Sequence, residues 1–276
     1  MVKSSYDKVE ELKNKNMKRN NWEVAIGLNK VDGLVPSEYL KELIEDSVEG
    51  KSSYKEIETK LFEYYENREK NSSERDMKEC DIVSTRIAEI LEDNSFIFSP
   101  VYLKSIHRYL FDGIFDKELK DYVGKFRDYN ITKKEPILNG KTVIYGNYQD
   151  LMEYLKYDFD EEKEVDYSKL SSESQVKRIS KFTSAIWQVH PFVEGNTRTT
   201  AVFIEKYLRT KGYNINNDLF KENSVYFRNA LVISNFSDIN LKISPDFKYL
   251  YSFFEKLIIN KNKNLLDIND FKNKMK

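Results

Sequence analysis

The ten residues HPFVEGNTRT, at 190–199, hold the densest group of chemically useful side chains in the chain. His190 is one of two histidines, and an imidazole exchanges a proton near neutral pH unaided. Glu194 offers a hard oxygen ligand of the kind that Mg²⁺ takes beside substrate phosphates. Arg198 offers a guanidinium that grips a phosphate through two hydrogen bonds. A general base, a metal ligand and a phosphate clamp this close together indicate phosphoryl or nucleotidyl transfer.

Two predicted helices position these side chains. Apolar residues at helical spacing over 174–190 predict a helix that stops at His190, because Pro191 disfavours helical backbone there. A second helix is predicted to begin near Thr197 and to stop at Gly212. The turn that opens it contains Gly195, Asn196, Thr197 and Arg198. Unpaired backbone N–H groups and the positive end of the helix dipole make such a turn an anion site.

Each feature also has a structural explanation. A lone histidine at a helix end is often a hydrogen-bonded structural residue, Glu-Gly-Asn is a common turn, and an arginine in a first helical turn is often solvated. Their coincidence within nine residues favours a functional loop.

Composition narrows the class of protein. With 276 residues, 40% of them hydrophobic and 33% charged, and with five prolines and nine glycines, we expect a mainly α globular protein. The net charge of −1 argues against nucleic acid as a partner. The single cysteine, Cys80, excludes an intrachain disulfide and a cysteine-rich zinc site. No apolar run suggests a membrane span or a signal peptide, so we expect a cytoplasmic protein, with export as an effector left open.

The sequence suggests three parts. Residues 1–20 form a polar, lysine-rich segment, and residues 21–72 predict a small module of three short helices. The polar stretch 69–80 is the best linker candidate, so the boundary is predicted near residue 72, with the remaining domain over 73–276. Within that domain, Asn139-Gly140 lies between two β-prone runs, which is typical of a two-residue β-hairpin.

HPFVEGNTR resembles the motif of the Fic family, usually H-P-F-x-D/E-G-N-G-R-x-x-R. The stretches RIAEILED, IHRYLFDGIFD and GKFRDYNI precede it in the order expected for Fic cores, so the resemblance covers roughly residues 80–240. It implies a Fic-type helical core with a small β-hairpin flap. It also implies transfer of AMP from ATP, with Mg²⁺, to a hydroxyl side chain of a target protein.

The resemblance assigns roles residue by residue. His190 would be the base, Phe192 an anchor for the loop and Glu194 the metal ligand. The phosphates would be held by Gly195, Asn196, the Thr197 N–H and Arg198. The flap edge that aligns the target would be Thr142, Val143 and Ile144, and the adenine or ribose would meet Tyr226 and Asn229.

Two positions depart from the motif. Thr197 replaces its second glycine, and Ala201 replaces its last arginine, which in the family contacts the γ-phosphate end. Transfer of another nucleotide or of a phosphate group, and a non-catalytic nucleotide-binding module, therefore stay open. A zinc hydrolase is disfavoured because His107 is the only other histidine and is more simply structural.

Residues 25–57 resemble the small antitoxins that partner some Fic toxins. Asp32-Gly33 falls where the antitoxins carry the Glu-Gly pair that obstructs productive ATP binding. The resemblance implies a fused inhibitory module. An accessory helical domain is the alternative, and a homo-oligomer is also left open.

Overall fold

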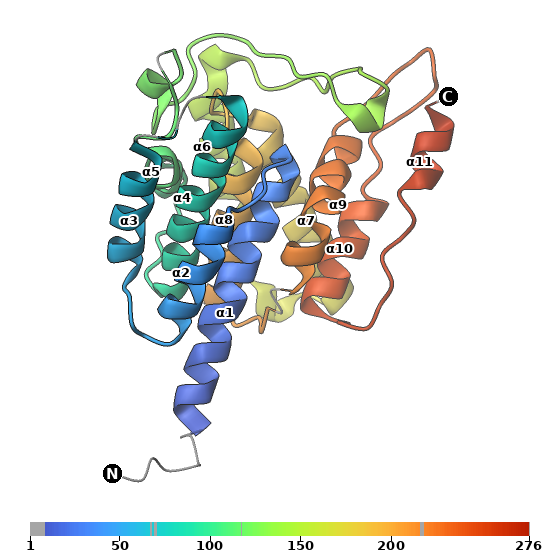
Figure 1. Cartoon of the computed structure of the whole chain (residues 1–276). Coiled ribbons are helices and arrows are strands. Elements are labelled where there is room, and N and C mark those ends of the chain that lie inside the picture. Colours follow the sequence, from blue (N-terminus) through green and yellow to red (C-terminus); the bar gives the residue numbers. More distant parts are fainter. Residues whose placement is uncertain (1–8, 67, 69–70, 117, 216–217, 276) are drawn as a thin grey trace, which may run out of the picture. The chain divides into compact units, whose positions relative to one another are not determined.

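The computed structural model describes residues 9–66, 68, 71–116, 118–215 and 218–275 (Figure 1). Eleven α-helices and five short 3-10 helices lie within these ranges. The described residues form no β-strand, and their one isolated bridge joins Asp238 and Ile243. The predicted mainly α class is confirmed. None of the described helices is long and apolar enough to cross a membrane.

The chain divides into two compact units, residues 1–95 with 217–222, and residues 96–216 with 223–276. The first unit contains α1 (Val9–Asn29), α2 (Glu38–Val48), α3 (Tyr54–Glu66) and α4 (Ser72–Glu92), with the 3-10 helix η1 (Lys30–Asp32). Within it α4 packs against both α1 and α3. Trp22, Leu28, Ile57 and Ile87 are among its buried side chains.

A buried carboxylate ties three helices of the first unit together. Asp81 of α4 accepts hydrogen bonds from the Ser37 N–H at 2.9 Å and from the Tyr65 hydroxyl of α3 at 2.7 Å. The Ser37 hydroxyl also donates to Asp81, while its oxygen caps α2 by accepting from the Leu40 N–H at 3.0 Å. Serine is a favoured N-cap, so α2 begins directly after Ser37.

Two predicted features of the N-terminal region differ from the structure. α1 begins at Val9, so a helix runs through much of the polar segment predicted over 1–20. Residues 72–80 of the predicted linker are also helical, because Asn71 caps α4 by accepting from the Glu74 N–H at 2.9 Å, while residues 69–70 lie outside the described residues. A buried stripe farther along α4 then packs within the first unit, so the division falls after Ser95 rather than near residue 72.

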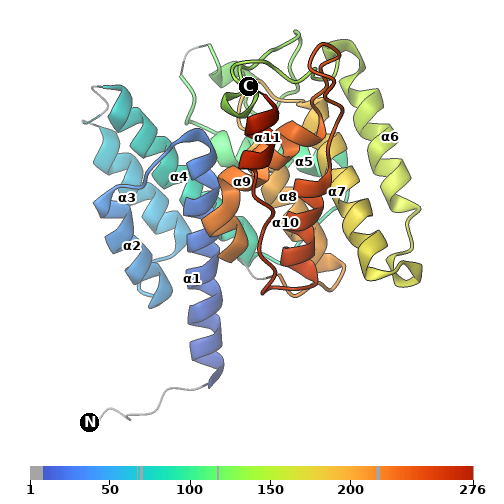
Figure 2. The same cartoon turned by 90° about the vertical axis from the view of Figure 1, so that its right-hand side faces the viewer.

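The second unit contains α5 (Pro100–Phe111), α6 (Leu151–Lys163), α7 (Ser172–Val189), α8 (Asn196–Thr210), most of α9 (Asp218–Ser234), α10 (Lys248–Ile258) and α11 (Asn269–Lys274). α7 packs against α6, α8 and α10, and α5 packs against α8; Figure 2 shows α6 and α7 side by side. The aromatic core between these helices includes Phe98, Phe159, Phe182 and Phe203.

Between α5 and α6 the described residues form no long element. Apart from residue 117, which lies outside the description, this stretch contains η2 (Lys120–Tyr122), η3 (Pro136–Leu138) and η4 (Tyr148–Asp150) as its regular elements, and Figure 1 shows it in green, crossing one end of the helices of the second unit. A further 3-10 helix, η5 (Tyr167–Lys169), precedes α7.

The predicted flap forms its turn but not its strands. Asn139 and Gly140 both have positive φ, at 52° and 83°, and the Lys141 N–H donates to the Leu138 carbonyl at 3.1 Å. These are features of the predicted two-residue turn. The run before it is the 3-10 helix η3, in which Pro136 has no N–H to donate to a strand ladder. The run after it, which includes residues 142–144, has no regular secondary structure.

Candidate functional site

His190 ends α7 in the way that its sequence predicts. Its backbone takes the left-handed conformation, with φ 48° and ψ 58°, and its N–H donates to the Trp187 carbonyl at 3.1 Å. This left-handed conformation ends the helix and turns the chain. A positive φ is uncommon for a residue other than glycine. The imidazole therefore stands at the junction of α7 and the loop that leads to α8.

The surroundings of His190 fix its protonation. Its Nδ1 lies 3.0 Å from the Trp187 carbonyl oxygen, which can only accept, so Nδ1 carries the hydrogen. The lone pair is then on Nε2. The ring stacks on Tyr145, with centroids 4.0 Å apart. Burial, with a smaller contribution from nearby positive charges such as Lys133, lowers the pKa of His190 to about 3, although the hydrogen bond to Trp187 acts in the opposite direction. The imidazole is therefore a neutral base at physiological pH.

Arg127 holds the backbone on which His190 stands. Its guanidinium donates to the carbonyl oxygens of His190 at 2.8 Å, Tyr129 at 2.7 Å and Val189 at 3.2 Å, and also to that of Gly146. Its own N–H donates to the Pro191 carbonyl at 2.8 Å. Because Arg127 is buried, it ties the end of α7 to the segment at Gly146 as a rigid clamp. Sequence reasoning missed this role, although Arg127 lies in the Fic-like stretch GKFRDYNI.

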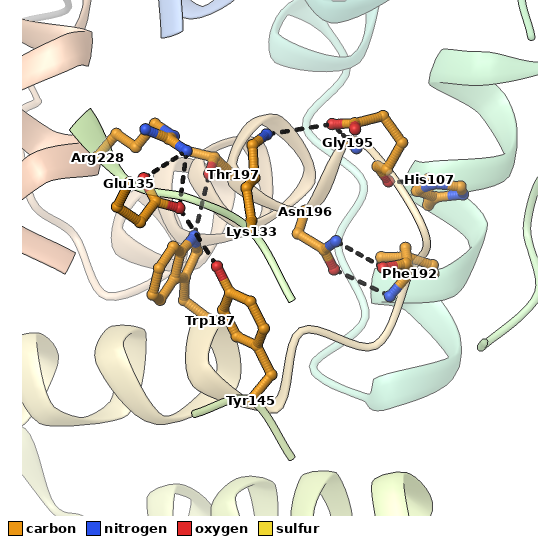
Figure 3. Close-up of polar contacts among 11 residues, drawn as sticks. His107, Lys133, Glu135, Tyr145, Trp187, Phe192, Gly195, Asn196, Thr197 and Arg228 are labelled. Carbon is orange, nitrogen blue, oxygen red and sulfur yellow. Dashed lines mark hydrogen bonds and ion pairs between the residues drawn. The ribbon is translucent and has the colours of Figure 1, made fainter. Parts of the chain in front are cut away.

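The loop after His190 is closed by a side chain (Figure 3). Asn196 accepts from the Phe192 N–H at 2.9 Å and donates to the Phe192 carbonyl at 2.7 Å. Phe192 is buried, and its ring stacks on His107 with centroids 3.9 Å apart. Phe192 thus lies where an anchor for the loop would lie. Asn196 shapes the loop with its side chain, and its backbone N–H stays available for a phosphate.

His107 of α5 has a partner for each ring nitrogen. The Gly124 N–H donates to Nδ1 at 3.0 Å, so Nε2 carries the hydrogen and donates to the Glu194 carbonyl at 3.1 Å. Burial, followed by the positive charge of Arg198, lowers the pKa of His107 to about 3. The ring is a neutral structural group, as the sequence suggested.

No side chain caps the N-terminus of α8. Gly195 occupies the N-cap with φ 75° and offers no side chain to bond the helix. A Cβ there would lie 2.4 Å from the Phe111 ring, so the turn requires glycine for space as well as for conformation. The N–H groups of Asn196 and Thr197 donate no hydrogen bond within the described part of the chain. This is the geometry of an anion site.

The side chains of Thr197 and Arg198, at the start of α8, both make contacts inside the protein. The Thr197 hydroxyl, present where the family has glycine, accepts from the Trp187 indole N–H at 3.0 Å (Figure 3). The hydroxyl is thereby engaged within the protein, while the Thr197 N–H stays available. Arg198 is only 1% exposed, with its guanidinium carbon 4.8 Å from the centre of the Phe111 ring, so it is not a merely solvated arginine.

Glu194 carries the carboxylate of the loop. Its side chain is 40% exposed, and its Oε1 accepts from the Gly195 N–H at 3.1 Å and lies 3.9 Å from the Lys133 Nζ. Both contacts use Oε1, which leaves Oε2 for a cation. No group of three His, Cys, Asp or Glu side chains gathers among the residues that the structure describes. A single carboxylate that would share a metal with substrate phosphates suits Mg²⁺.

A buried ion pair connects α9 to the same site. Glu135 is paired with Arg228 of α9, with 2.8 Å between Oε2 and Nη2, and it accepts from the Tyr145 hydroxyl at 3.3 Å (Figure 3). Tyr145 in turn stacks on His190. Sequence reasoning missed all three residues. The helical spacing of apolar residues in α9 does not indicate that Arg228 faces this site.

Tyr226, one of the two predicted nucleotide residues of α9, contacts α10. The Tyr226 hydroxyl donates to the Tyr249 carbonyl of α10 at 3.5 Å, and its ring stacks with Phe253. Asn229 is partly buried. Neither residue makes a hydrogen bond, ion pair or ring contact with residues 190–198 in the described part of the chain, so their roles toward adenine or ribose stay predictions.

The predicted flap edge lies close to the site. The backbone N–H groups of Thr142, Val143 and Ile144 donate no hydrogen bond within the described part of the chain. Val143 is buried, whereas Ile144 is 79% exposed.

Asp32 and Gly33 lie at the end of η1 in the first unit, and Gly33 has φ 75°. The inhibitory role of these two residues stays a prediction.

Comparisons with known proteins agree with this geometry. Residues 97–208 match the sequence model of the Fic/DOC family. The fold is similar to that of a Fic-domain-containing signaling protein from Bacteroides thetaiotaomicron VPI-5482, with 19% identity and a TM-score of 0.53 over 96% of this chain and 84% of that one. It is also similar to the N-terminal FIC domain of Bep8, a VirB-translocated effector of Bartonella sp. 1-1C, with 20% identity and a TM-score of 0.51 over 71% of this chain and 90% of that one.

No curated protein matches the chain. Residues 97–208 are a Fic/DOC domain, and the helical scaffold around them has the Fic fold. The family is generally one of transferases.

Proposed function

We propose that this chain is a protein adenylyltransferase that moves AMP from ATP to a hydroxyl side chain of a target protein. The observation that carries the proposal is the neutral His190 with its lone pair on Nε2, one short loop from the open N-terminus of α8. Nε2 takes the proton of the target hydroxyl as its oxygen bonds to the α-phosphorus. The bond from that phosphorus to the bridging oxygen breaks, and pyrophosphate leaves.

The phosphates are held by the start of α8. The N–H groups of Asn196 and Thr197 donate to phosphate oxygens, and the helix dipole favours the negative charge. Arg198, in the first turn of α8, adds positive charge near the phosphates. Donors already fixed by the fold stabilise charge without reorganising during the reaction.

Glu194 holds the metal in this proposal, through the carboxylate oxygen that its loop contacts leave unused. Mg²⁺, when bound, neutralises phosphate charge during the transfer. The Lys133 Nζ lies 3.9 Å from Oε1, the carboxylate oxygen that the metal does not use. Glu194→Gln would keep the shape of the loop and remove the charge that the metal needs.

The target is aligned by the segment 142–144. Because its N–H groups have no partner in the described part of the chain, an extended target segment can pair with them as an added strand. Val143 anchors this segment in the core, and Ile144 presents an apolar side chain to the target.

A labelling experiment separates the alternatives. The full chain is incubated with Mg²⁺, a cell lysate as the source of target, and ATP labelled on either the α- or the γ-phosphate, beside the His190→Ala variant. Label from the α-phosphate alone, lost in the variant, supports adenylyl transfer. Label from the γ-phosphate indicates phosphotransfer, which the missing arginine at Ala201 leaves open. ATP binding without either label indicates a non-catalytic module.

We also propose, from the resemblance of residues 25–57 to Fic antitoxins, that the first unit restrains the activity through Asp32. Asp32→Ala should then raise the rate of transfer in the same assay. Asp46→Ala, a change in another partly exposed carboxylate of the first unit, serves as the control. Equal rates in the wild type and both variants would favour an accessory helical unit.

A further inference from the structure

A cavity of about 490 Å³ lies beside the candidate active site, within the second unit. One wall is the segment 144–147, and the other walls come from α6 and α7. Tyr145 lines the cavity and also stacks on the His190 ring. Val189, the residue before His190, lines it as well. A side chain bound in this cavity would therefore lie next to the proposed base.

The wall formed by the segment is held in place. The Gly146 N–H donates to the Gln188 carbonyl at 3.1 Å, and the Gln188 side-chain amide donates to the Ile144 carbonyl at 3.3 Å. Arg127 donates to the Gly146 carbonyl from the other side. These bonds join the segment to the last turn of α7, so the cavity is built into the fold.

Asp158 of α6 lines the same cavity without a partner. It is partly buried, and it makes no hydrogen bond or ion pair with the residues that the structure describes. Burial raises the pKa of Asp158 to about 6. The nearby Arg178 is committed elsewhere, since its Nε lies 2.6 Å from the Glu162 carboxylate. A cation in the cavity would supply the compensation that this carboxylate lacks.

The rest of the lining also favours a cation. Tyr145, Tyr154 and Tyr157 bring three aromatic rings to the walls, and the faces of such rings attract ammonium and guanidinium groups. Asp150, which accepts from the Tyr154 hydroxyl at 3.4 Å, brings a second carboxylate next to one of these rings. No lysine or arginine lines the cavity.

We propose that this cavity is a pocket for a basic side chain, arginine or lysine, of the target protein. The Asp158 carboxylate pairs with the cation, and the tyrosine rings surround its aliphatic stem. Occupation of the pocket places the adjoining target chain along the segment 142–144 and its acceptor hydroxyl near His190. That the protein carrying this side chain is a target of transfer rests on the proposed adenylyl transfer. Binding of the side chain itself requires no ATP.

The test measures binding alone. The full chain is titrated with N-acetyl-arginine methylamide, with its lysine counterpart and with the uncharged isostere N-acetyl-citrulline methylamide, and Kd values are taken from NMR shifts of Tyr154 and Tyr157. We expect a basic probe to shift both tyrosine signals and to bind about tenfold more tightly than citrulline, as an ion pair with cation-π contacts provides.

Two variants on the same helix complete the test. Asp158→Asn should remove the preference for the basic probe. Asp160→Asn should keep it, because Asp160 is paired with Lys156 at 2.6 Å and does not line the cavity. Absence of shifts at these tyrosines, equal Kd values for the basic and neutral probes, or a preference that survives in Asp158→Asn would each overturn the pocket. Basic-probe binding in a chain that transfers no label would keep the pocket and reject the proposed reaction.

Discussion

The two histidines of the chain are buried in similar surroundings but end in different chemical states. Each ring stacks on an aromatic side chain, and burial lowers each pKa to about 3. His107 uses both ring nitrogens to join the Gly124 N–H to the Glu194 carbonyl. His190 uses only Nδ1, and its Nε2 keeps a lone pair.

This difference separates a scaffold residue from a candidate base. A lowered pKa does not distinguish the two, because burial acts on both rings. The number of ring nitrogens already bound by the protein does distinguish them, since only a free lone pair can accept a proton. Four substitutions and one change of pH test whether the two histidines differ in this way.

His190→Ala should lower the rate of AMP transfer by about 10²- to 10⁴-fold, because it removes the proton acceptor. The free energy of unfolding should change far less than this loss in rate would suggest. Initial rates with α-labelled ATP and urea unfolding curves give the two quantities. A variant that keeps more than about a tenth of the wild-type rate would contradict the role of His190 as base.

Arg127→Met should lower the free energy of unfolding by about 3 kcal/mol or more, because several buried carbonyls, that of His190 among them, lose a charged donor. Urea denaturation of the full chain measures the change. Lys125→Met, an exposed change two residues away, should stay within about 0.5 kcal/mol of wild type. Equal stability of the two variants would show that the clamp contributes nothing.

His107→Ala should lower the free energy of unfolding by about 2–3 kcal/mol, because two buried hydrogen bonds and the stack on Phe192 are lost. Transfer per folded molecule should fall by much less than in His190→Ala. Ser105→Ala, an exposed change on α5, is the matched control. A loss of rate as large as that of His190→Ala would erase the distinction between the histidines.

Thr197→Val should lower the free energy of unfolding by about 1 kcal/mol, because the Trp187 indole N–H loses its acceptor while the volume is kept. Transfer should change little, since the Thr197 N–H is retained. Thr197→Ser keeps the hydroxyl and should behave as wild type for this hydrogen bond. A large loss of rate in Thr197→Val alone would mean that Trp187 must be held for His190 to act.

The pH dependence should be the smallest effect. With a pKa lowered from 6.5 to about 3, His190 stays neutral between pH 8 and pH 6, so the rate should lose less than about half over this range. The stability that the neutral ring contributes is present above pH 6.5 and declines as the pH falls from 6.5 toward 3. A rate that falls with a midpoint near 6.5 would mean that the ring titrates as if exposed.

Much of the local structure could be predicted from the sequence. The end of the helix at His190 follows from Pro191, the cap of α2 follows from Ser37, and the turn at residues 139–140 follows from Asn-Gly. These features depend on neighbouring residues only. The two strands predicted for the flap do not form. A β-prone run needs a partner strand, which Pro136 and the surrounding chain do not provide.

The extent of the N-terminal helices was also beyond the sequence pattern. The stretch 69–80 is polar enough to suggest a linker, yet Asn71 caps a helix whose later residues, such as Val83 and Ile87, are buried within the first unit. Tertiary burial therefore decided a structure that local polarity argued against.

The residue types in HPFVEGNTR, and their place at the ends of two helices, follow from the sequence alone, because residue type and helix punctuation are local properties. Tertiary contacts were needed to establish that His190 keeps Nε2 free while His107 uses both ring nitrogens, that the Thr197 hydroxyl accepts from Trp187, and that Arg127 and Tyr145 support His190. Those contacts join residues up to 87 positions apart in the chain, and no sequence period records them.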